Sequence, residues 1–545
     1  MSSKLKILPV GGCGEIGKNM TVLEYEDDIV IVDAGIMFPQ NDMLGIDFII
    51  PDYKYVVERR EKVRGVLITH GHEDHVGAIG HLMGEIDAPI YATRLTKGLL
   101  ELKLREYDGL EDVVVHEITP DDTFEVGCFT VEPFHVTHSI PDCVGFAIDT
   151  PVGLVVHTGD YKFDYTPVDE WPPDFAKLAE FSSRGVLCLL GDSTNVHEEG
   201  WTKSEADIEK AFDELFATAP GRIIVVSFAS LISRIQQVAW MAEKHGRRLA
   251  ITGRSMRENS QMARDLGYLT VDEDNLIDID QANSLPGNKV VIMATGSQGE
   301  PRSVLGRLAT GRHRTLGIRK GDTVVISAHT IPGNEEPVYR IINRLLQRGA
   351  NVLYEENADV HVSGHASRDE MKLMLNLVRP RFFIPIHGEL RHLKEHARLA
   401  ESVGIWPEHI AVVENGTPVE MDEETMIVHD RLPGGYIFVD GARVGEIGWS
   451  VMRDRDKLAQ DGFFHVFVST NSDGQLLSKP EVTSRGFANF KADPELLDGA
   501  IETVEKAVDS YTNQNQTLTS RVEEALARYL YEETGRRPLI FASVK

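Results

Sequence analysis

The sequence has few cysteines, no long apolar run and too few basic residues to balance its acids, and each shortage excludes a class of protein. The four cysteines are widely scattered and form no CxxC pair, which is typical of free thiols in a reducing cytoplasm. No apolar stretch approaches the roughly 18 residues that indicate a membrane span. The apolar segment before Gly11-Gly12 is too short for a signal peptide. We therefore expect a cytoplasmic protein that makes no use of a membrane.

The charge balance bears on nucleic-acid binding. The chain has 56 Lys and Arg against 85 Asp and Glu, which gives a formal net charge of -29. Proteins that coat nucleic acid nonspecifically depend on Lys and Arg to neutralise phosphates, so the composition argues against that class. A local basic channel inside an acidic exterior is still compatible with these counts.

The hydrophobic pattern changes along the chain, and 545 residues are enough for two to four domains. The first part predicts short, half-buried strands that end on Gly, Asp or Pro. We place these strands at 5–10, 21–25, 28–33, 65–69, 129–134, 144–149 and 154–158. No internal repeat or low-complexity linker interrupts the sequence.

From about Thr202 the pattern becomes an alternation of helices and strands. Thr202-Lys203-Ser204-Glu205 resembles a helix N-cap box. After it we expect helices at 232–244 and 335–348 and strands at 222–228, 248–252, 289–295, 323–328 and 351–354. Such a repeat predicts a mostly parallel, doubly wound sheet. A last module has strands at 463–469 and 538–544 and helices at 494–510 and 517–533.

One motif suggests a nucleotide but lacks the required context. Gly12-x-Gly14-x-x-Gly17 follows a strand, as in a dinucleotide-binding fingerprint. That fingerprint must open a helix, whereas residues 20–33 read as two strands. We therefore expect these glycines to shape a tight loop near the functional site.

The densest chemistry lies in Thr69-His70-Gly71-His72-Glu73-Asp74-His75, directly after an apolar strand. Three imidazoles and a carboxylate within six residues are ligands that zinc and manganese accept in hydrolytic sites. A surface cluster of histidines is the alternative, but four ligand-type side chains this close together favour a metal. These four residues supply only part of a two-metal coordination sphere, so further ligands are expected elsewhere.

Three more segments end an apolar strand with ligand-type side chains. They are His135-Val136-Thr137-His138, His157-Thr158-Gly159-Asp160 and Pro385-Ile386-His387. The order HxHxDH, then His, then Asp after a strand, then a distant His resembles the metallo-β-lactamase superfamily. The resemblance implies an αββα sandwich with two divalent metal ions, zinc or manganese, at one edge.

The resemblance also implies roles for these residues. His70, His72 and His138 would hold the first metal, Asp74, His75 and His387 the second, and Asp160 would bridge them. Asp33 resembles the family's first-motif acid, which orients a metal-binding histidine. His135 and His157 have no place in this scheme, and we interpret them as supporting or structural residues.

More than two hundred residues separate Asp160 from His387, and most of them form the predicted doubly wound segment. A domain inserted in this way is similar to the β-CASP nucleases, in which Asp192, His365 and His387 match additional motifs. Finer likeness in 11–19, 294–301, 331–335 and 385–389 resembles the ribonuclease J family. The implied organisation is given by four segments: 1–204 metallo-β-lactamase, 205–355 β-CASP, 356–447 the returning metallo-β-lactamase part and linker, and 448–545 an α+β module for oligomerisation.

The resemblance implies hydrolysis of RNA phosphodiesters in RNA maturation and decay. It implies 5′→3′ exonuclease action on single-stranded RNA with a 5′-monophosphate, endonuclease action, assembly into homodimers or homotetramers, and partners in RNA decay. General acid–base chemistry adds that His365, hydrogen-bonded to Asp192, could protonate the leaving oxygen or bind the phosphate. The catalytic candidates are therefore Asp160, Asp192 and His365.

Two loops have the small, donor-rich composition that suits a phosphate. One is the strand-to-helix turn with Ser230, Leu231, Ile232 and Ser233, although its serines could simply cap a helix. The other is His361, Val362, Ser363, Gly364 and His365. A DNA nuclease or other hydrolase of this fold is the main alternative, and a noncatalytic RNA-binding scaffold is less favoured because every ligand is present.

Overall fold

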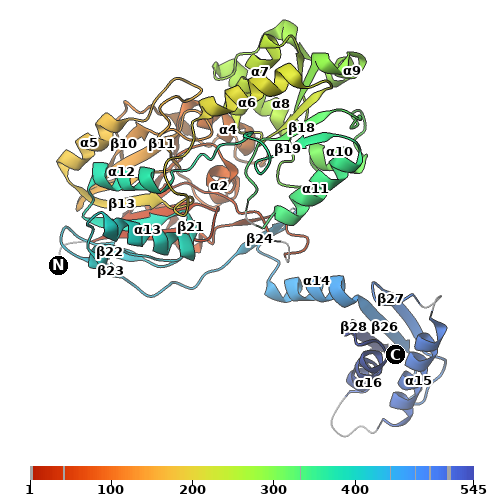
Figure 1. Ribbon diagram of the computed structural model, residues 1–545. Coiled ribbons are helices and arrows are strands. Elements are labelled where there is room, and N and C mark those ends of the chain that lie inside the picture. Colours follow the sequence, from red (N-terminus) through yellow and green to blue (C-terminus); the bar gives the residue numbers. More distant parts are fainter. Residues whose placement is uncertain are drawn as a thin grey trace. The chain divides into compact units, whose positions relative to one another are not determined.

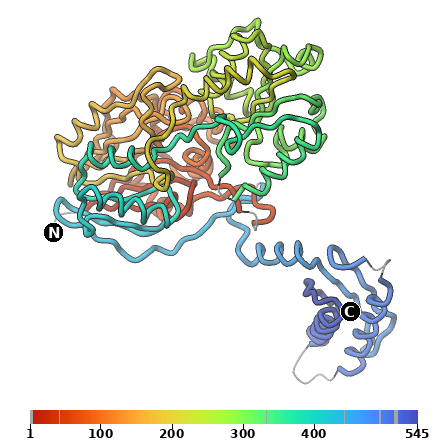
Figure 2. The backbone as a smooth tube through the Cα atoms, in the orientation of Figure 1, coloured from red at the N-terminus to blue at the C-terminus, as the bar shows by residue number. Residues whose placement is uncertain are grey.

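The computed structural model describes residues 4–40, 43–331, 333–441, 443–472, 474–489, 493–511 and 517–545. The chain forms two compact units, which are considered separately: residues 1–38 with 48–437, and residues 39–47 with 438–545. Figure 1 labels their elements, and Figure 2 traces the backbone. Among the described helices, none combines the length and apolar character needed to cross a membrane.

Two facing sheets form the metal-binding part of the first unit. One has the order β23-β22-β1-β3-β4-β6-β7-β8 and the other β20-β13-β12-β11-β10-β9. The first is built from β1 Leu5–Gly11, β3 Met20–Tyr25, β4 Asp28–Val32, β6 Val63–Leu67, β7 Ile90–Ala92, β8 Val115–Glu117, β22 Val419–Met421 and β23 Met426–Val428. The second is built from β9 Phe124–Val126, β10 Phe129–His135, β11 Val144–Thr150, β12 Gly153–His157, β13 Val186–Asp192 and β20 Phe382–Ile386.

Apolar side chains hold these two sheets together. Val30 of one sheet and Phe146 and Ile384 of the other belong to the same buried core, because strands that are buried on both faces need apolar residues at most positions. Helices α5 Phe175–Arg184, α12 Arg368–Val378 and α13 Leu390–Ser402 pack on the outer face of the six-stranded sheet. This layering is the expected αββα sandwich.

A third sheet lies between the two halves of the sandwich in sequence. Its order is β16-β15-β17-β14-β18-β19, and its pairings are parallel. The strands are β14 Ile223–Val226, β15 Arg248–Ile251, β16 Leu276–Ile277, β17 Val290–Ala294, β18 Thr323–Ile326 and β19 Asn351–Leu353. Helices α6 Glu205–Thr218, α7 Ile232–Lys244 and α8 Arg254–Leu266 cover one face. Helices α9 Ile279–Ser284, α10 Val304–Thr310 and α11 Glu335–Gln347 cover the other, which confirms the doubly wound prediction.

The predicted cap box at the start of this domain is wrong. Helix α6 begins at Glu205, and Ser204 is its N-cap residue, with its hydroxyl accepting from the Ala206 N–H. Thr202 instead donates its hydroxyl to the backbone oxygen of His365 at 2.8 Å. Glu205 is buried because it pairs with Arg234 at 2.8 Å. Tertiary contacts have therefore replaced the local capping that the sequence pattern suggested.

The second unit has its own small core. Strands β26 Phe463–Val468, β27 Glu481–Arg485 and β28 Leu539–Val544 form a sheet in the order β27-β26-β28. Helices α15 Pro494–Asp509 and α16 Leu518–Thr534 pack on one face of it, around Phe464, Val466 and Leu526. This arrangement agrees with the α+β module expected from the sequence.

Candidate functional site

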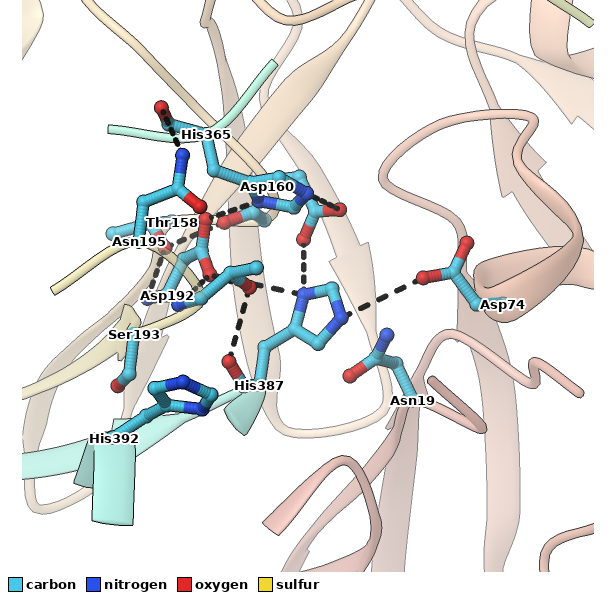
Figure 3. A network of polar contacts seen from close by, with 12 residues as sticks. Asn19, Asp74, Thr158, Asp160, Asp192, Ser193, Asn195, His365, His387 and His392 are labelled. Atoms are coloured by element: carbon cyan, nitrogen blue, oxygen red, sulfur yellow. Dashed lines mark hydrogen bonds and ion pairs between the residues drawn. The ribbon is translucent and has the colours of Figure 1, made fainter. Parts of the chain in front are cut away.

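Three of the predicted site residues follow neighbouring parallel strands. Strands β12, β13 and β20 pair in parallel, with Asp192 opposite Ile386. The carboxyl ends of parallel strands lie at the same edge of a sheet, which is where ligands bind in open α/β sheets. Asp160, Asp192 and His387 therefore meet at one edge, as Figure 3 shows.

His70, His72 and His138 form a first group of donor atoms. The Nε2 atoms of His70 and His138 each lie 3.1 Å from Nδ1 of His72. In a tetrahedral zinc site with Zn–N bonds of about 2.05 Å, ligand nitrogens are about 3.3 Å apart. The three rings are thus spaced as a metal tripod requires, with the loop 69–75 supplying two of them.

Asp74, His75 and His387 form a second group, and Asp160 lies between the two. Asp74 Oδ2 is 3.7 Å from His75 Nε2 and 3.5 Å from His387 Nε2. Asp160 Oδ2 is 3.1 Å from His75 Nε2 in this group and 3.7 Å from His70 Nε2 in the first. One carboxylate oxygen is therefore placed to be shared by both groups.

Two of the inward-facing histidines, His75 and His138, have a hydrogen-bond partner on the nitrogen opposite the centre. His75 donates Nδ1–H to Asp33 Oδ2 at 2.8 Å, and Asp33 also accepts from the Thr69 hydroxyl at 2.9 Å. His138 donates Nδ1–H to the Gly364 carbonyl oxygen at 2.7 Å. These hydrogen bonds leave the Nε2 lone pairs directed toward the centre, the form that binds a metal.

The electrostatics of the site divide along the same two groups. Burial, reinforced by neighbouring histidines, holds the pKa of His70 well below its usual range, and burial lowers the pKa of His72 to about 4. Burial acts in the same direction on His387, but the Asp160 carboxylate outweighs it and raises the pKa of His387 to about 10. The first group is neutral and ready to donate lone pairs, whereas the second contains excess buried carboxylate.

This donor set fits divalent cations. Nε2 of His387 is buried without a hydrogen-bond partner among the described residues, and the His70, His72 and His138 nitrogens face one another at hydrogen-bond distance. Asp33 and Asp160 are almost completely buried, and buried carboxylates need compensating positive charge. Imidazole and carboxylate donors are those that zinc and manganese accept.

Beside the metal donors lies a histidine–aspartate pair. His365 donates Nδ1–H to Asp192 Oδ2 at 2.8 Å, and its Nε2 is 3.9 Å from Asp160 Oδ2. Burial lowers the pKa of His365, but the Asp192 and Asp160 carboxylates outweigh this effect and raise it overall. Asp192 is fully buried, and the His365 side chain is 20% exposed, so the ring can meet a ligand while the acid holds it.

Comparison with known proteins identifies the family. The sequence matches family models described as "Metallo-beta-lactamase superfamily" at 13–215, "Ribonuclease J, beta-CASP domain" at 220–345, "Zn-dependent metallo-hydrolase RNA specificity domain" at 351–412 and "Ribonuclease J C-terminal domain" at 450–544. It is 44% identical to Ribonuclease J of Thermus thermophilus, over 99% of this chain and 95% of that protein. The chain belongs to the ribonuclease J family.

Other members of the ribonuclease J family show similar likeness. Ribonuclease J of Synechocystis is 40% identical, over 98% of this chain and 86% of that protein. Ribonuclease J2 of Bacillus subtilis is 39% identical, over 99% of this chain and 98% of that protein. A solved structure of an Enterococcus faecalis protein of unknown function, with 15% identity and a TM-score of 0.55, covers 77% of this chain and all of that protein, and it supports the fold alone. Membership makes the chain a metal-dependent ribonuclease.

The predicted phosphate loops of this ribonuclease lie beside the metal donors. In the loop 361–365, Ser363 Oγ accepts from Asn195 Nδ2 at 2.7 Å and from the His365 N–H at 3.1 Å. Gly364 contacts His138, as described above, and Val362 is buried. His361 is half-buried, and its Nδ1 has no hydrogen-bond partner among the described residues.

The other loop is only partly exposed. Leu231 and Ile232 are buried, and Ser230 is half-buried, so the two apolar residues offer at most their backbone. Ser233 lines a small cavity together with His138 and other residues of both domains. The apolar residues of this loop therefore anchor helix α7, and its serines are the better candidates for a ligand.

Sequence reasoning missed some residues at the centre. Asn19 places Nδ2 3.0 Å from His75 Nε2, and its backbone N–H donates to the Asp74 carbonyl at 2.9 Å. The Gly12-x-Gly14-x-x-Gly17 loop does lie beside the site, as expected, and it carries Asn19 there. Of the two histidines left unassigned, His135 stacks on Trp171 at 4.0 Å, and the ring of His157 accepts from the Gly159 N–H at 3.1 Å.

Proposed function

We propose that this ribonuclease degrades single-stranded RNA in the 5′→3′ direction, prefers a 5′-monophosphate end and also cleaves internally, in cytoplasmic RNA maturation and decay. One observation carries the proposal. The His365–Asp192 pair stands within 4 Å of Asp160, the carboxylate that both donor groups share. This closeness supports a site in which a proton donor, the acid that holds it and the metal donors act on one phosphodiester.

Two divalent ions, zinc or manganese, would be held by this centre. His70, His72 and His138 would hold one, Asp74, His75 and His387 the other, and Asp160 both. When bound, such ions activate water for attack and withdraw charge from the phosphate oxygens. Asp33 acts on the ions indirectly, because its hydrogen bond fixes the His75 ring.

His365 would supply the proton that the leaving 3′-oxygen needs. The raised pKa makes the imidazolium form of His365 more available than it is in a free histidine, and Asp192 keeps the Nδ1 side occupied so that Nε2 faces the reaction centre. Protonation of the 3′-oxygen leaves the phosphate on the downstream fragment. Each cut thus creates the 5′-monophosphate end that the next cycle would prefer.

The loop that holds His365 has a donor available for a terminal phosphate. Ser363 Oγ already accepts two hydrogen bonds, so its own O–H proton is free to be donated to a ligand. Ser233 lines the cavity beside His138, and Ser230 lies in the same turn. We infer that these serines, with backbone groups of Leu231, Ile232, Val362 and Gly364 and the side chain of His361, bind the RNA end.

The domain boundaries and the assembly belong to the same proposal. We assign 1–204 and 356–447 to the metal-binding domain and its linker, 205–355 to the β-CASP domain and 448–545 to a module for homodimer or homotetramer formation. The match of 450–544 to a C-terminal domain of this family supports a separate domain in the last segment, and its role in assembly is part of the proposal. Partners in an RNA-decay complex would add to this assembly.

The decisive experiment compares RNA ends. Matched single-stranded RNA and DNA with 5′-monophosphate, triphosphate or hydroxyl ends are incubated with enzyme loaded with Mn²⁺ or Zn²⁺, and the products are separated by length. We expect mononucleotides from RNA with a 5′-monophosphate. RNA with a 5′-triphosphate or 5′-hydroxyl should instead be cut internally and give longer fragments. Equal rates on all three ends would refute the end preference, and cleavage of DNA alone would refute the substrate.

The role of His365 is tested by His365→Ala. We expect single-turnover cleavage to slow by about 10²- to 10⁴-fold, while the metal content measured by mass spectrometry stays that of the wild type. Asp192→Asn is the matched variant, because it keeps the shape of the acid but removes the charge that raises the His365 pKa. A large loss of bound metal in His365→Ala would contradict the assigned role.

A further inference from the structure

The β-CASP domain carries a concentration of positive charge that the metal site does not use. Residues 301–350 contain nine Lys and Arg against three Asp and Glu, in a chain whose net charge is -29. Seven of these cations come from the carboxyl end of α10, the segment before β18 and the end of α11. We call them the basic surface: Arg307, Arg312, Arg314, Arg319, Lys320, Arg344 and Arg348.

Backbone and side-chain contacts bring these segments together. The Arg348 Nε–H donates to the Ala309 carbonyl at 2.8 Å, which joins the ends of α11 and α10. The Gly321 N–H donates to the Gly349 carbonyl at 3.0 Å, which places Lys320 beside Arg348. In Figure 1 the two helices lie side by side in the green part of the chain. The basic surface is therefore one patch in space.

The charges of this patch are exposed and unneutralised. All seven residues are exposed, and none of them takes part in an ion pair with a carboxylate of the described residues. The one acid within the segment 307–330, Asp322, is buried and paired with Arg222. Exposed arginines without acidic partners repel one another, so their accumulation calls for a counter-charge from outside the chain.

A structural role explains only some of these residues. Arg307 and Arg348 lie at the ends of helices, where cations stabilise the helix dipole and its free carbonyl groups. Arg319 donates to the Asn283 carbonyl at 3.1 Å. Arg312, Arg314 and Arg344 have no side-chain hydrogen bond to any described residue. Helix capping therefore does not explain why Arg312, Arg314 and Arg344 are present.

The basic surface lies at the amino ends of the strands of the β-CASP sheet, whereas the metal donors lie toward their carboxyl ends. Strands β14 and β18 are parallel neighbours, and the turn after β14 leads to Ser233 beside His138. The basic segment precedes β18 and so lies at the amino ends of the strands. Four strand residues span about 13 Å, so a ligand of the patch is separate from a ligand of the metal centre.

We propose that the basic surface is an exosite for the phosphate backbone of RNA that extends beyond the metal cleft. The inference rests on RNA being the substrate. Arginine is the residue suited to bidentate phosphate binding, and six of the seven cations are arginines. Because the rest of the chain is strongly acidic and repels RNA, this patch would give long substrates an attachment that short ones cannot reach.

The test reverses three charges whose side chains form no hydrogen bond or ion pair with a described residue. Arg312→Glu/Arg314→Glu/Arg344→Glu is compared with Arg105→Glu/Arg379→Glu/Arg381→Glu, three exposed arginines of the first unit that also form no ion pair with a described residue. Both variants change the net charge equally. For each metal-loaded enzyme, kcat/KM is measured on single-stranded RNAs of about 8 and about 60 nucleotides, and binding of a cleavage-resistant 2′-O-methyl RNA of each length is measured across salt concentrations.

We expect the patch variant to lose about tenfold or more in kcat/KM and in affinity, for the long RNA only. The slope of log K against log salt concentration should become shallower by about two. The control variant should match the wild type. Equal losses on both lengths, or no loss on either, would overturn the inference. So would a changed oligomeric mass with unchanged RNA binding, which would assign the patch to contacts between copies. If the short RNA is not cleaved by the wild type, the proposed function fails, while the binding measurements still decide on the exosite.

Discussion

At the scale of single residues, the contact between Gly364 and His138 shows how the β-CASP motifs reach the metal donors. The Gly364 carbonyl accepts from His138 Nδ1, and a Cβ at position 364 would lie 2.5 Å from Cε1 and Nδ1 of that ring. No side chain fits there without moving the histidine. The glycine is therefore required by close approach and not by its backbone angles.

Gly364→Ala should consequently displace His138 and weaken metal binding. Changes beside metal-binding histidines typically cost 10- to 100-fold in affinity or activity, so we expect a loss of about that size. Metal titration followed by calorimetry measures it, with RNA cleavage as a second readout. Gly317→Ala is the matched control, because a Cβ there meets open space. Wild-type metal affinity in Gly364→Ala would refute the argument.

The shared carboxylate of Asp160 gives a second prediction at this scale. Asp160→Ala removes the one oxygen that faces both donor groups, so we expect cleavage to be abolished while the circular dichroism spectrum stays native. Asp149→Ala, at an exposed position of β11, should retain activity. Full activity of Asp160→Ala would exclude the two-metal arrangement.

At the scale of elements, local pattern predicted about half of the strands and a minority of the helices in the described part of the chain, and tertiary contact decided the rest. Helix α7 has the predicted bounds 232–244, because buried apolar residues recur at helical spacing, as at Ile232, Ile235, Val238 and Ala242. The helix α8 was missed, since its composition is mostly polar. The parallel pairing of β12, β13 and β20 joins segments far apart in sequence, and no local signal shows it.

The same distinction holds for the site. The ligand-type residues stand out because rare side chains follow apolar strands, and the structure brings all of them together. Asn19 and Gly364 do not stand out, because their importance depends on which ring they touch. Arg234 directly follows the candidate phosphate turn at 230–233, but it is buried and donates to the Val360 carbonyl at 2.8 Å. Sequence chemistry therefore predicts the donors better than it predicts their supports.

That buried arginine joins several elements and supports a stability prediction. Arg234 of α7 pairs with Glu205 of α6, and both are almost fully buried. Arg234→Ala leaves Glu205 with Lys162, 3.6 Å away, as its buried cation, so we expect a cost of about 3 kcal/mol, the low end of the range for breaking a buried pair. We expect a clearly lower urea midpoint. Arg254→Ala, which removes an exposed arginine with two surface ion pairs, should cost at most about 1 kcal/mol; equal effects of the two changes would contradict the prediction.

At the scale of the whole molecule, the metal centre concerns stability as well as chemistry. Asp33, Asp74, Asp160 and Asp192 converge on one sheet edge, and the histidines around them offset only part of the buried charge. The strands that meet there come from segments separated by the entire β-CASP domain. Bound cations would neutralise the remaining charge of these carboxylates and would thereby hold these strands together.

Removing the metal with a chelator should abolish cleavage and lower the first thermal transition. A ligand present at about 100 times its dissociation constant stabilises the folded state by about 2.7 kcal/mol, and adding back Mn²⁺ or Zn²⁺ should restore both properties. Hydrogen exchange gives the internal control: peptides from 153–160 and 382–389 should lose protection in the apo protein, while those from α15 and α16, in the second unit, should not. Equal loss of protection everywhere would show that the metal acts on global folding instead of on this edge.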